Sequence, residues 1–304
     1  MPGPQVVVAM VTPFSNGGID RGAVSWLASR LSESGVTGVF VPGTTGEWPL
    51  LTPEERAEAF FSVASSAIGG LRLIAGVSSL RPEESYRLAE EAASHGAHAV
   101  MATPPFYYRP TPSFLAEFYR GLKRASGGLP TMMYLIPSNL GFTLEVSVVE
   151  SLVAAGVVDG IKATVYDYSY ILGLASVKDR HPEFEVLAGG LEMLAPTLLA
   201  GGDGAVDAFA NVLPGLAVSI VEAIEEGDLA RLGELQRRAR RLAGLFRGYQ
   251  TPPALKALLS RLGAPVKPES REPLESLGER DAETLVKAVC EGYSEFLLPG
   301  LRCP

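Results

Sequence analysis

The sequence is poor in the residues that bind zinc and build disulfide frameworks. Its 304 residues include three histidines, His95, His98 and His181, and two cysteines, Cys290 and Cys303. His95 and His98 flank a Gly-Ala pair with no further ligand type close by, so we expect no metal site. The cysteines have the spacing of neither a metal motif nor a redox motif, and we expect both to remain thiols in a reducing, intracellular compartment.

Segments that would bind a membrane or a nucleic acid are also lacking. Residues 1–4 have no charged region followed by an apolar core, so they do not resemble a signal peptide. No apolar run reaches the roughly 20 residues that cross a bilayer. The formal net charge of −8 disfavours nucleic acid and anionic lipid as partners. We therefore expect a cytoplasmic protein whose partners are small molecules.

Lysine is scarce as well, with six among the 26 basic residues. Lys162 directly follows an apolar, β-branched run that begins at Val157, which is typical of a strand buried on both faces. Burial is expected to lower the pKa of its amine, and a neutral amine forms a Schiff base with a ketone. The alternative is a lysine whose long stem carries the charge to water. No other lysine follows a strand-like run, so Lys162 is the one Schiff-base candidate.

What the sequence does contain is an alternation of strand-like and helix-like segments. Eight such units follow one another, and this indicates a parallel sheet closed into an α/β (β/α)8 barrel, the TIM barrel. A doubly wound open sheet is the alternative, but no G-x-G-x-x-G turn follows the first strand. The predicted strands lie near residues 6–11, 36–41, 71–75, 97–102, 131–135, 157–162, 185–188 and 204–206.

The alternation ends after about residue 226. Helical segments follow near residues 228–247, 252–262 and 278–297 without intervening strands. A connection rich in proline and charge, residues 263–273, joins the last two. We therefore predict a catalytic barrel over residues 1–226 and a C-terminal helical appendage over residues 227–304.

Polar residues that follow the predicted strands are the candidates for chemistry, because active sites of such barrels lie at the C-terminal strand ends. Thr44 and Thr45 follow the second strand in a glycine-flanked turn, which offers N–H groups and hydroxyls to a carboxylate. An ordinary capped turn is the alternative. Tyr134 ends the fifth strand, where it would move protons or simply fill the barrel. Tyr107 and Tyr108 follow the fourth strand and would line a pocket or an interface.

Three short motifs stand in register on these units. They are Gly-Thr-Thr-Gly-Glu at 43–47, Tyr-x-x-Pro-Ser at 134–138 and Gly-Ile-Lys at 160–162. In this order and at this spacing they resemble the dihydrodipicolinate synthase / N-acetylneuraminate lyase superfamily of pyruvate-dependent class I aldolases. The resemblance covers nearly the whole chain, including the helical tail. It implies no cofactor and no metal, a keto acid and an aldehyde as substrates, and a homotetramer built from tight dimers.

The resemblance also implies a role for each candidate residue. Lys162 would be the Schiff-base lysine, and Tyr134 the acid/base beside it. Thr44 and Thr45 would hold the carboxylate of the keto acid, with Thr44 hydrogen-bonded to the tyrosine as well. Tyr107 is similar to a tyrosine that reaches across a dimer contact in the synthases. The further substrate-binding positions that it implies are Tyr107, Tyr108, Arg109, Gly189 and Val206.

The sequence departs from the residue patterns of two branches of this superfamily, and these departures narrow the choice of substrate. Asn139 stands where dihydrodipicolinate synthases carry an arginine, and Ala163 where they usually carry glutamate. Leu191 and Ala208 replace an acid and a serine that bind sugar hydroxyls in N-acetylneuraminate lyases, although Glu192 matches a second acid. The natural substrates of both branches are therefore disfavoured.

The 2-keto-3-deoxygluconate aldolases are the remaining large branch, and they lack the synthase arginine. Tyr108 and Arg109 would suit a phosphorylated aldehyde there. We therefore expect an aldolase that cleaves 2-keto-3-deoxygluconate, with or without a 6-phosphate, to pyruvate and the glyceraldehyde. Alternatives are a dihydrodipicolinate synthase, a related sugar-acid dehydratase, a barrel enzyme without a covalent step, and a non-catalytic keto-acid-binding homologue. The intact lysine, tyrosine and threonines argue against the last.

Overall fold

Eight strands are hydrogen-bonded into a closed barrel, in the order β1-β10-β9-β8-β7-β6-β5-β4, in a computed structural model that describes residues 3–66 and 69–304. The ladders from β5 through β10, and between β1 and β4, are parallel. The predicted (β/α)8 barrel is therefore confirmed. The barrel strands are β1 Gln5–Ala9, β4 Gly38–Val41, β5 Arg72–Gly76, β6 Ala99–Ala102, β7 Thr131–Leu135, β8 Gly160–Ala163, β9 Glu185–Gly189 and β10 Gly204–Asp207.

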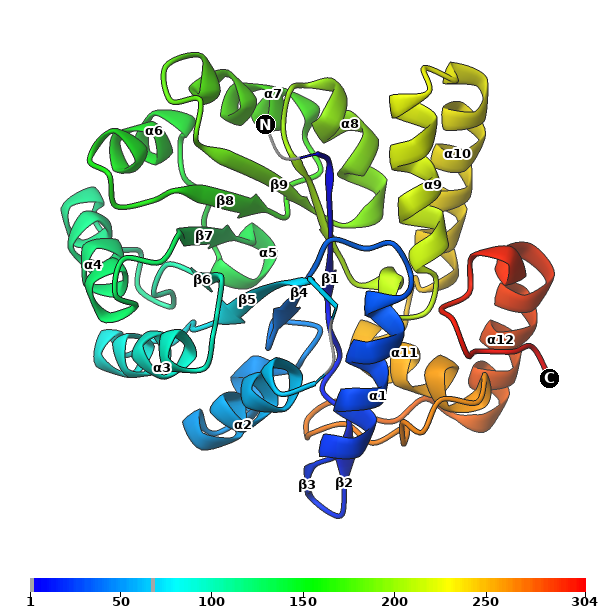
Figure 1. The fold of residues 1–304 in the computed structure, drawn as a ribbon. Coiled ribbons are helices and arrows are strands. Elements are labelled where there is room, and N and C mark those ends of the chain that lie inside the picture. The colour runs from blue at the N-terminus through cyan, green and yellow to red at the C-terminus, as the bar shows by residue number, and fades with distance from the viewer. Residues whose placement is uncertain (1–2, 67–68) are drawn as a thin grey trace. The chain divides into compact units, whose positions relative to one another are not determined.

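Two compact units make up the chain. The first comprises Met1–Gln5 with Arg72–Val206, and the second Val6–Leu71 with Asp207–Pro304. In the first unit, the helices other than the short α5 lie along the outer side of the strands that they connect (Figure 1). Every residue of β6, β7 and β8 is buried, as expected for parallel strands that are covered on both faces. The helices of this unit are α3 Pro82–Ser94, α4 Pro112–Ala125, α5 Pro137–Leu140, α6 Val146–Ala154, α7 Tyr168–Ser176 and α8 Leu194–Leu199.

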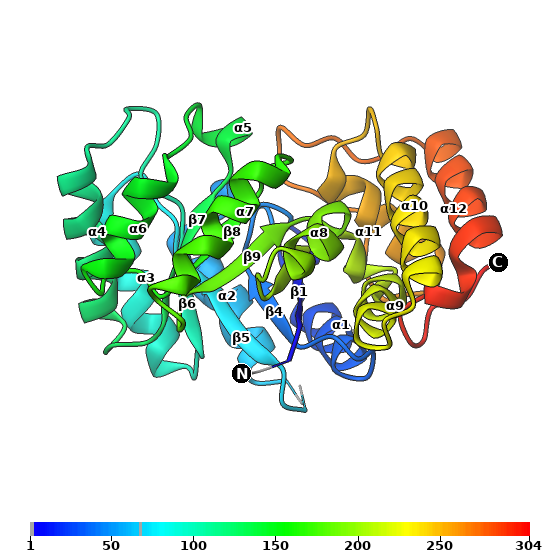
Figure 2. The same ribbon diagram turned by 90° about the horizontal axis from the view of Figure 1, so that it is seen from above.

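The second unit holds the C-terminal helices, which are present as predicted. In both views α9 lies beside α10 (Figures 1 and 2), and α11 packs against α12. Among the described residues, no helix combines the length and the apolar character that crossing a bilayer requires. The helices of this unit are α1 Arg21–Ser32, α2 Pro53–Ala64, α9 Pro214–Glu225, α10 Leu229–Leu245, α11 Thr251–Arg261 and α12 Glu279–Tyr293.

Two helices of the second unit begin where the sequence signals a start. The side chain of Asp20 accepts a hydrogen bond from the Ala23 N–H at the start of α1. At the start of α2, Thr52 and Glu55 form a reciprocal capping box, and Pro53 occupies the first turn. Such caps satisfy backbone N–H groups that have no partner within the helix.

A short antiparallel hairpin lies outside the predicted elements. It pairs β2, Phe14–Ser15, with β3, Gly18–Ile19. Asn16 and Gly17 connect the two strands with positive φ angles of 54° and 79°. Asn-Gly is a strong signal for a two-residue hairpin, because both residues tolerate this conformation.

The expectation that both cysteines remain thiols is wrong. Cys290 on α12 and Cys303 form a disulfide bond, with 5.7 Å between their Cα atoms. The chain turns back after α12, where the Leu298 N–H donates to the Val212 carbonyl and the Arg302 N–H to the Leu262 carbonyl. Spacing alone does not reveal such a reversal, which is what brings the two sulfur atoms together.

Candidate active site

Lys162 and Tyr134 lie side by side within the first unit. They occupy paired positions on the parallel strands β8 and β7. The Lys162 Nζ lies 3.9 Å from the centre of the Tyr134 ring. Lys162 is 4% exposed and Tyr134 2%, so the alternative in which the lysine carries its charge to water does not fit. The structure thus places a buried amine against a phenol, which is a nucleophile beside a group that can transfer protons.

A buried hydroxyl lies two residues after the lysine, directly beyond the end of β8. The Thr164 N–H donates to the Leu135 carbonyl at 2.8 Å, whereas the buried Thr164 Oγ1 has no hydrogen-bond partner among the residues that the structure describes. A buried hydroxyl that lacks a partner costs about 1–3 kcal/mol. Thr164 was not among the sequence candidates. Its position two residues after Lys162 was a usable signal, because alternate residues of an extended segment point to the same side.

Gly189 faces this threonine from the end of β9. A Cβ atom built on Gly189 would lie 1.9 Å from the Thr164 Oγ1, so only glycine fits. Val206 pairs with Gly189 in the β9–β10 ladder, and its carbonyl accepts a hydrogen bond from the Gly190 N–H at 3.0 Å. The two backbone positions that the sequence singled out, Gly189 and Val206, therefore lie next to each other.

Tyr107 and Tyr108 form an exposed pair on the loop after β6. Each is 81% exposed, and their rings meet edge to face with centroids 5.0 Å apart. Tyr107 has a positive φ angle of 76°, which is uncommon for a residue with a bulky side chain. Arg109 follows and is exposed too. Large exposed aromatic side chains of this kind are more typical of an interaction surface than of a pocket wall.

Thr44 and Thr45 lie in the second unit, in a tight turn after β4. The Glu47 N–H donates to the Thr44 carbonyl at 3.0 Å, and the Thr12 hydroxyl donates to the Gly46 carbonyl at 2.8 Å. A Cβ atom on Gly46 would lie 3.0 Å from the Met10 carbonyl oxygen, closer than such contacts normally come. Backbone packing therefore fixes this turn from several sides.

Glu47, at the end of the same turn, is buried and ionically paired. Its carboxylate accepts hydrogen bonds from the Lys256 Nζ at 2.5 Å and from the Arg271 N–H at 2.8 Å. Burial lowers the pKa of Lys256 to about 8, against the opposing effect of the Glu47 charge. Lys256 was not a sequence candidate, because its position within a helix does not reveal that it is buried.

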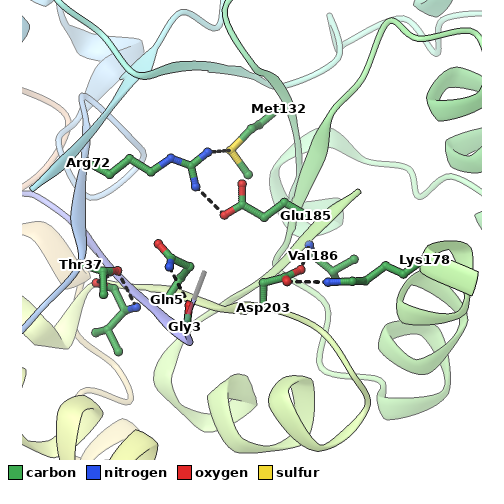
Figure 3. A network of polar contacts seen from close by, with 10 residues as sticks. Gly3, Gln5, Thr37, Arg72, Met132, Lys178, Glu185, Val186 and Asp203 are labelled. Carbon is green, nitrogen blue, oxygen red and sulfur yellow. Dashed lines mark hydrogen bonds and ion pairs between the residues drawn. The ribbon is translucent and has the colours of Figure 1, made fainter. Parts of the chain in front are cut away.

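The opposite, N-terminal ends of the strands in the first unit carry paired charges (Figure 3). Arg72 pairs with Glu185 at 2.5 Å, and Lys178 pairs with Asp203 at 2.5 Å. They line a cavity of about 680 Å³, and both of its cations are bound to carboxylates. This end of a barrel usually serves stability, so we place the candidate site at the other end. No group of acidic, histidine or cysteine side chains that could hold a metal ion occurs in the part of the chain that the structure describes.

Comparison with known proteins gives a consistent result. Residues 4–291 match the Dihydrodipicolinate synthetase family. An uncharacterized DapA-like lyase of Thermofilum pendens is 34% identical over 275 residues, which cover 88% of this chain and 90% of the relative. The 4-hydroxy-tetrahydrodipicolinate synthase 1 of Streptomyces coelicolor is 34% identical over 286 residues, or 93% and 92% of the two chains.

A solved structure extends the similarity to the fold. It is that of YagE, a prophage protein of the dihydrodipicolinic acid synthase family from E. coli K12, in complex with pyruvate. The TM-score is 0.89 and the identity 25%, and the match covers 95% of this chain and 98% of YagE. Barrel and C-terminal helices therefore match together.

Proposed function

Because this chain belongs to the dihydrodipicolinate synthetase family of pyruvate-dependent lyases, we propose that it is a Schiff-base-forming aldolase that cleaves 2-keto-3-deoxygluconate to pyruvate and glyceraldehyde. The observation that carries the proposal is the contact of the buried Lys162 amine with the Tyr134 ring. Imine formation requires proton transfers, which a neighbouring acid/base accelerates, and the Tyr134 ring lies against the amine.

The cleavage follows from these two side chains. Lys162 attacks the ketone carbon at C2, and water leaves to give a protonated imine. Tyr134 accepts the proton of the C4 hydroxyl while the C3–C4 bond breaks, and the electron pair of that bond forms an enamine as the aldehyde departs. A proton then returns to C3, and water hydrolyses the imine to free pyruvate and Lys162. The imine acts as the electron sink, so the chain's own residues suffice for these steps.

We assign the carboxylate of the keto acid to the Thr44–Thr45 turn. The support is the resemblance of the Gly-Thr-Thr-Gly-Glu motif and the build of the turn, whose backbone is held by Thr12 and Glu47. A turn that offers N–H groups and hydroxyls suits a carboxylate. A rigid turn also orients the substrate, so that less entropy is lost in the chemical step.

We propose that Thr164 forms a hydrogen bond with a hydroxyl group of the sugar acid. Its buried Oγ1 has no partner among residues 3–66 and 69–304, and a polyhydroxylated chain can supply one.

A second candidate function is the synthesis of 4-hydroxy-tetrahydrodipicolinate, which the Streptomyces coelicolor relative supports. Asn139 and Ala163 disfavour it, because the synthases carry arginine and usually glutamate there.

We also propose that Tyr107 and Tyr108 lie in a dimer contact and that the protein is a homotetramer. The exposure of both rings supports this, since monomers rarely leave such aromatic pairs in water. Light scattering of the wild type and of a Tyr107→Ala/Tyr108→Ala variant tests it. A wild type that is already monomeric would contradict it.

Borohydride reduction in the presence of pyruvate tests the proposed function. We expect a three-carbon adduct on Lys162 by peptide mapping, and none on Lys256. Cleavage of 2-keto-3-deoxygluconate and of its 6-phosphate, and condensation of pyruvate with glyceraldehyde, aspartate semialdehyde or N-acetylmannosamine, then identify the aldehyde. An adduct on another lysine would overturn the site, and aspartate semialdehyde as the best acceptor would favour the synthase.

A further inference from the structure

A second buried lysine lies outside the residues to which a chemical step is assigned. Lys256, in the middle of α11, is fully buried, and its Nζ donates to the Glu47 carboxylate at 2.5 Å and to the Glu269 carbonyl at 2.8 Å. The other carboxylate oxygen of Glu47 accepts from the Arg271 N–H at 2.8 Å. Both oxygens of Glu47 are thus bound to the C-terminal segment, and Lys256 is 209 residues away in sequence.

The Glu47–Lys256 ion pair lies at a strained point of the Thr44–Thr45 turn. Glu47 has a φ angle of 62°, in the left-handed region, and its N–H closes the turn onto the Thr44 carbonyl. A side chain other than glycine in this region costs on the order of 1 kcal/mol and persists only where the surroundings impose it. Here the buried ion pair supplies the constraint, so the shape of the turn depends on Lys256.

The surroundings keep water away from the pair. The Phe14 ring lies between two cations, with the Lys256 Nζ 4.0 Å and the Arg271 guanidinium carbon 4.8 Å from its centre. Arg271 in turn pairs with Glu55 on α2. A buried ion pair is often no more stabilising than a packed apolar pair, so stability alone does not explain the charges. A charged pair with fixed hydrogen bonds does define one geometry, which an apolar contact defines less sharply.

We propose that Glu47 and Lys256 are positioning residues for the substrate carboxylate. Lys256 holds Glu47, and Glu47 holds the Thr44–Thr45 turn in the shape that receives the carboxylate of the keto acid. The inference rests on the proposed function, because it takes this turn to be the carboxylate site. Lys256 itself does not touch the substrate and acts through Glu47.

Borohydride trapping with two different ketones distinguishes a role of Lys256 in positioning the substrate from a role in folding. Pyruvate and acetone form imines with the same lysine, but only pyruvate carries a carboxylate. In a Lys256→Met variant we expect borohydride trapping of pyruvate on Lys162 to require about 10- to 100-fold more ketone, whereas trapping of acetone changes less than about twofold. Lys178→Met, which breaks the ion pair of Lys178 with Asp203 in the first unit, is the matched control and should leave the ratio of the two ketones unchanged.

A double variant keeps the test informative if Lys256→Met folds poorly. Glu47→Leu/Lys256→Met replaces both buried charges by apolar groups. In other proteins, replacing a whole buried ion pair in this way is often neutral or stabilising, whereas removing one partner is not. We expect this variant to fold and still to lose its preference for pyruvate over acetone. A wild-type preference in the double variant, or an equal loss for both ketones in both variants, would overturn the positioning role. A wild type without any pyruvate adduct would instead overturn the proposed function, and the carboxylate role with it.

Discussion

The Lys162 amine lies 3.9 Å from the centre of the Tyr134 ring, at paired positions of two adjacent parallel strands. Both side chains project from the barrel wall and not from a loop. Their separation is therefore fixed by the strand ladder, which varies less than loop geometry. A lysine held in this way needs little rearrangement before it attacks a ketone.

Replacing Lys162 by arginine keeps a long cationic side chain but removes the nucleophile. We expect the borohydride adduct to disappear and kcat/KM to fall by about 10⁴-fold or more, because a covalent step has no substitute. Mass spectrometry and initial rates measure the two effects. Residual turnover above a thousandth of the wild-type rate, about 4 kcal/mol in barrier, would argue for a mechanism without an imine.

Tyr134→Phe keeps the ring against the amine and removes only the phenolic hydroxyl. We expect kcat/KM to fall by about 10²- to 10⁴-fold, as is usual for loss of a general acid/base. Tyr119→Phe is the matched control, because the Tyr119 hydroxyl is buried in the same unit and donates only to the Ala102 carbonyl. That variant should lose stability and keep its rate; equal rates for both variants would refute the role of Tyr134.

Thr164→Val replaces the unpartnered hydroxyl by a methyl group of similar size. We expect the free energy of unfolding to stay the same or rise by about 1 kcal/mol, because a buried hydroxyl without a partner is removed. Cleavage of 2-keto-3-deoxygluconate should fall about tenfold, while pyruvate trapping on Lys162 is unchanged. Thr197→Val, at another buried hydroxyl without a partner, is the control and should leave the cleavage rate alone.

Stability at alkaline pH reports on Lys256. Burial lowers the pKa of its amine from 10.5 to about 8 in the folded protein. Between pH 8 and pH 10.5 the unfolded chain binds more protons than the folded one, so the free energy of unfolding rises with pH. Below about pH 8 Lys256 is protonated in both states, and the cost of burying its charge lowers the free energy of unfolding in full. Denaturant titrations at several pH values, compared with Glu47→Leu/Lys256→Met, isolate this contribution. A difference between the two proteins that does not change with pH would contradict the lowered pKa.

The disulfide bond between Cys290 and Cys303 should be measurable as a gain in stability. The two residues are 13 positions apart, and closing a loop of this length contributes about 3 kcal/mol. Thiol alkylation without a reductant should find no free cysteine. Reduction should lower the Tm of the wild type but not that of Cys290→Ser/Cys303→Ser, and a wild type indifferent to reductant would show that the bond adds little.

The order of strands and helices could be predicted because unbroken apolar runs, caps and glycines are local signals. Lys162 was found for the same reason, since a lysine that ends a buried run stands out. The division of the chain at residue 226 stays a prediction.

Features that depend on distant segments could not be predicted. The disulfide requires the chain to reverse after α12, and neither cysteine carries a local sign of that reversal. Lys256 looks like any helical lysine until Glu47, 209 residues away, is known to face it. Thr164 had a local signal in its spacing from Lys162, but its lack of a hydrogen-bond partner is visible only in three dimensions.

The pairing of Glu47 with Lys256 has a consequence for synthesis on the ribosome. Translation proceeds from the N-terminus, so Glu47, at the end of the Thr44–Thr45 turn, is made 209 residues before Lys256, whose ammonium group holds it. A chain released after Asp207 would contain all eight barrel strands and both candidate reactive side chains, yet its Glu47 would have no cation from α11. Nascent and C-terminally clipped chains would therefore bind keto acids poorly, and full activity would appear only once the last helices are in place.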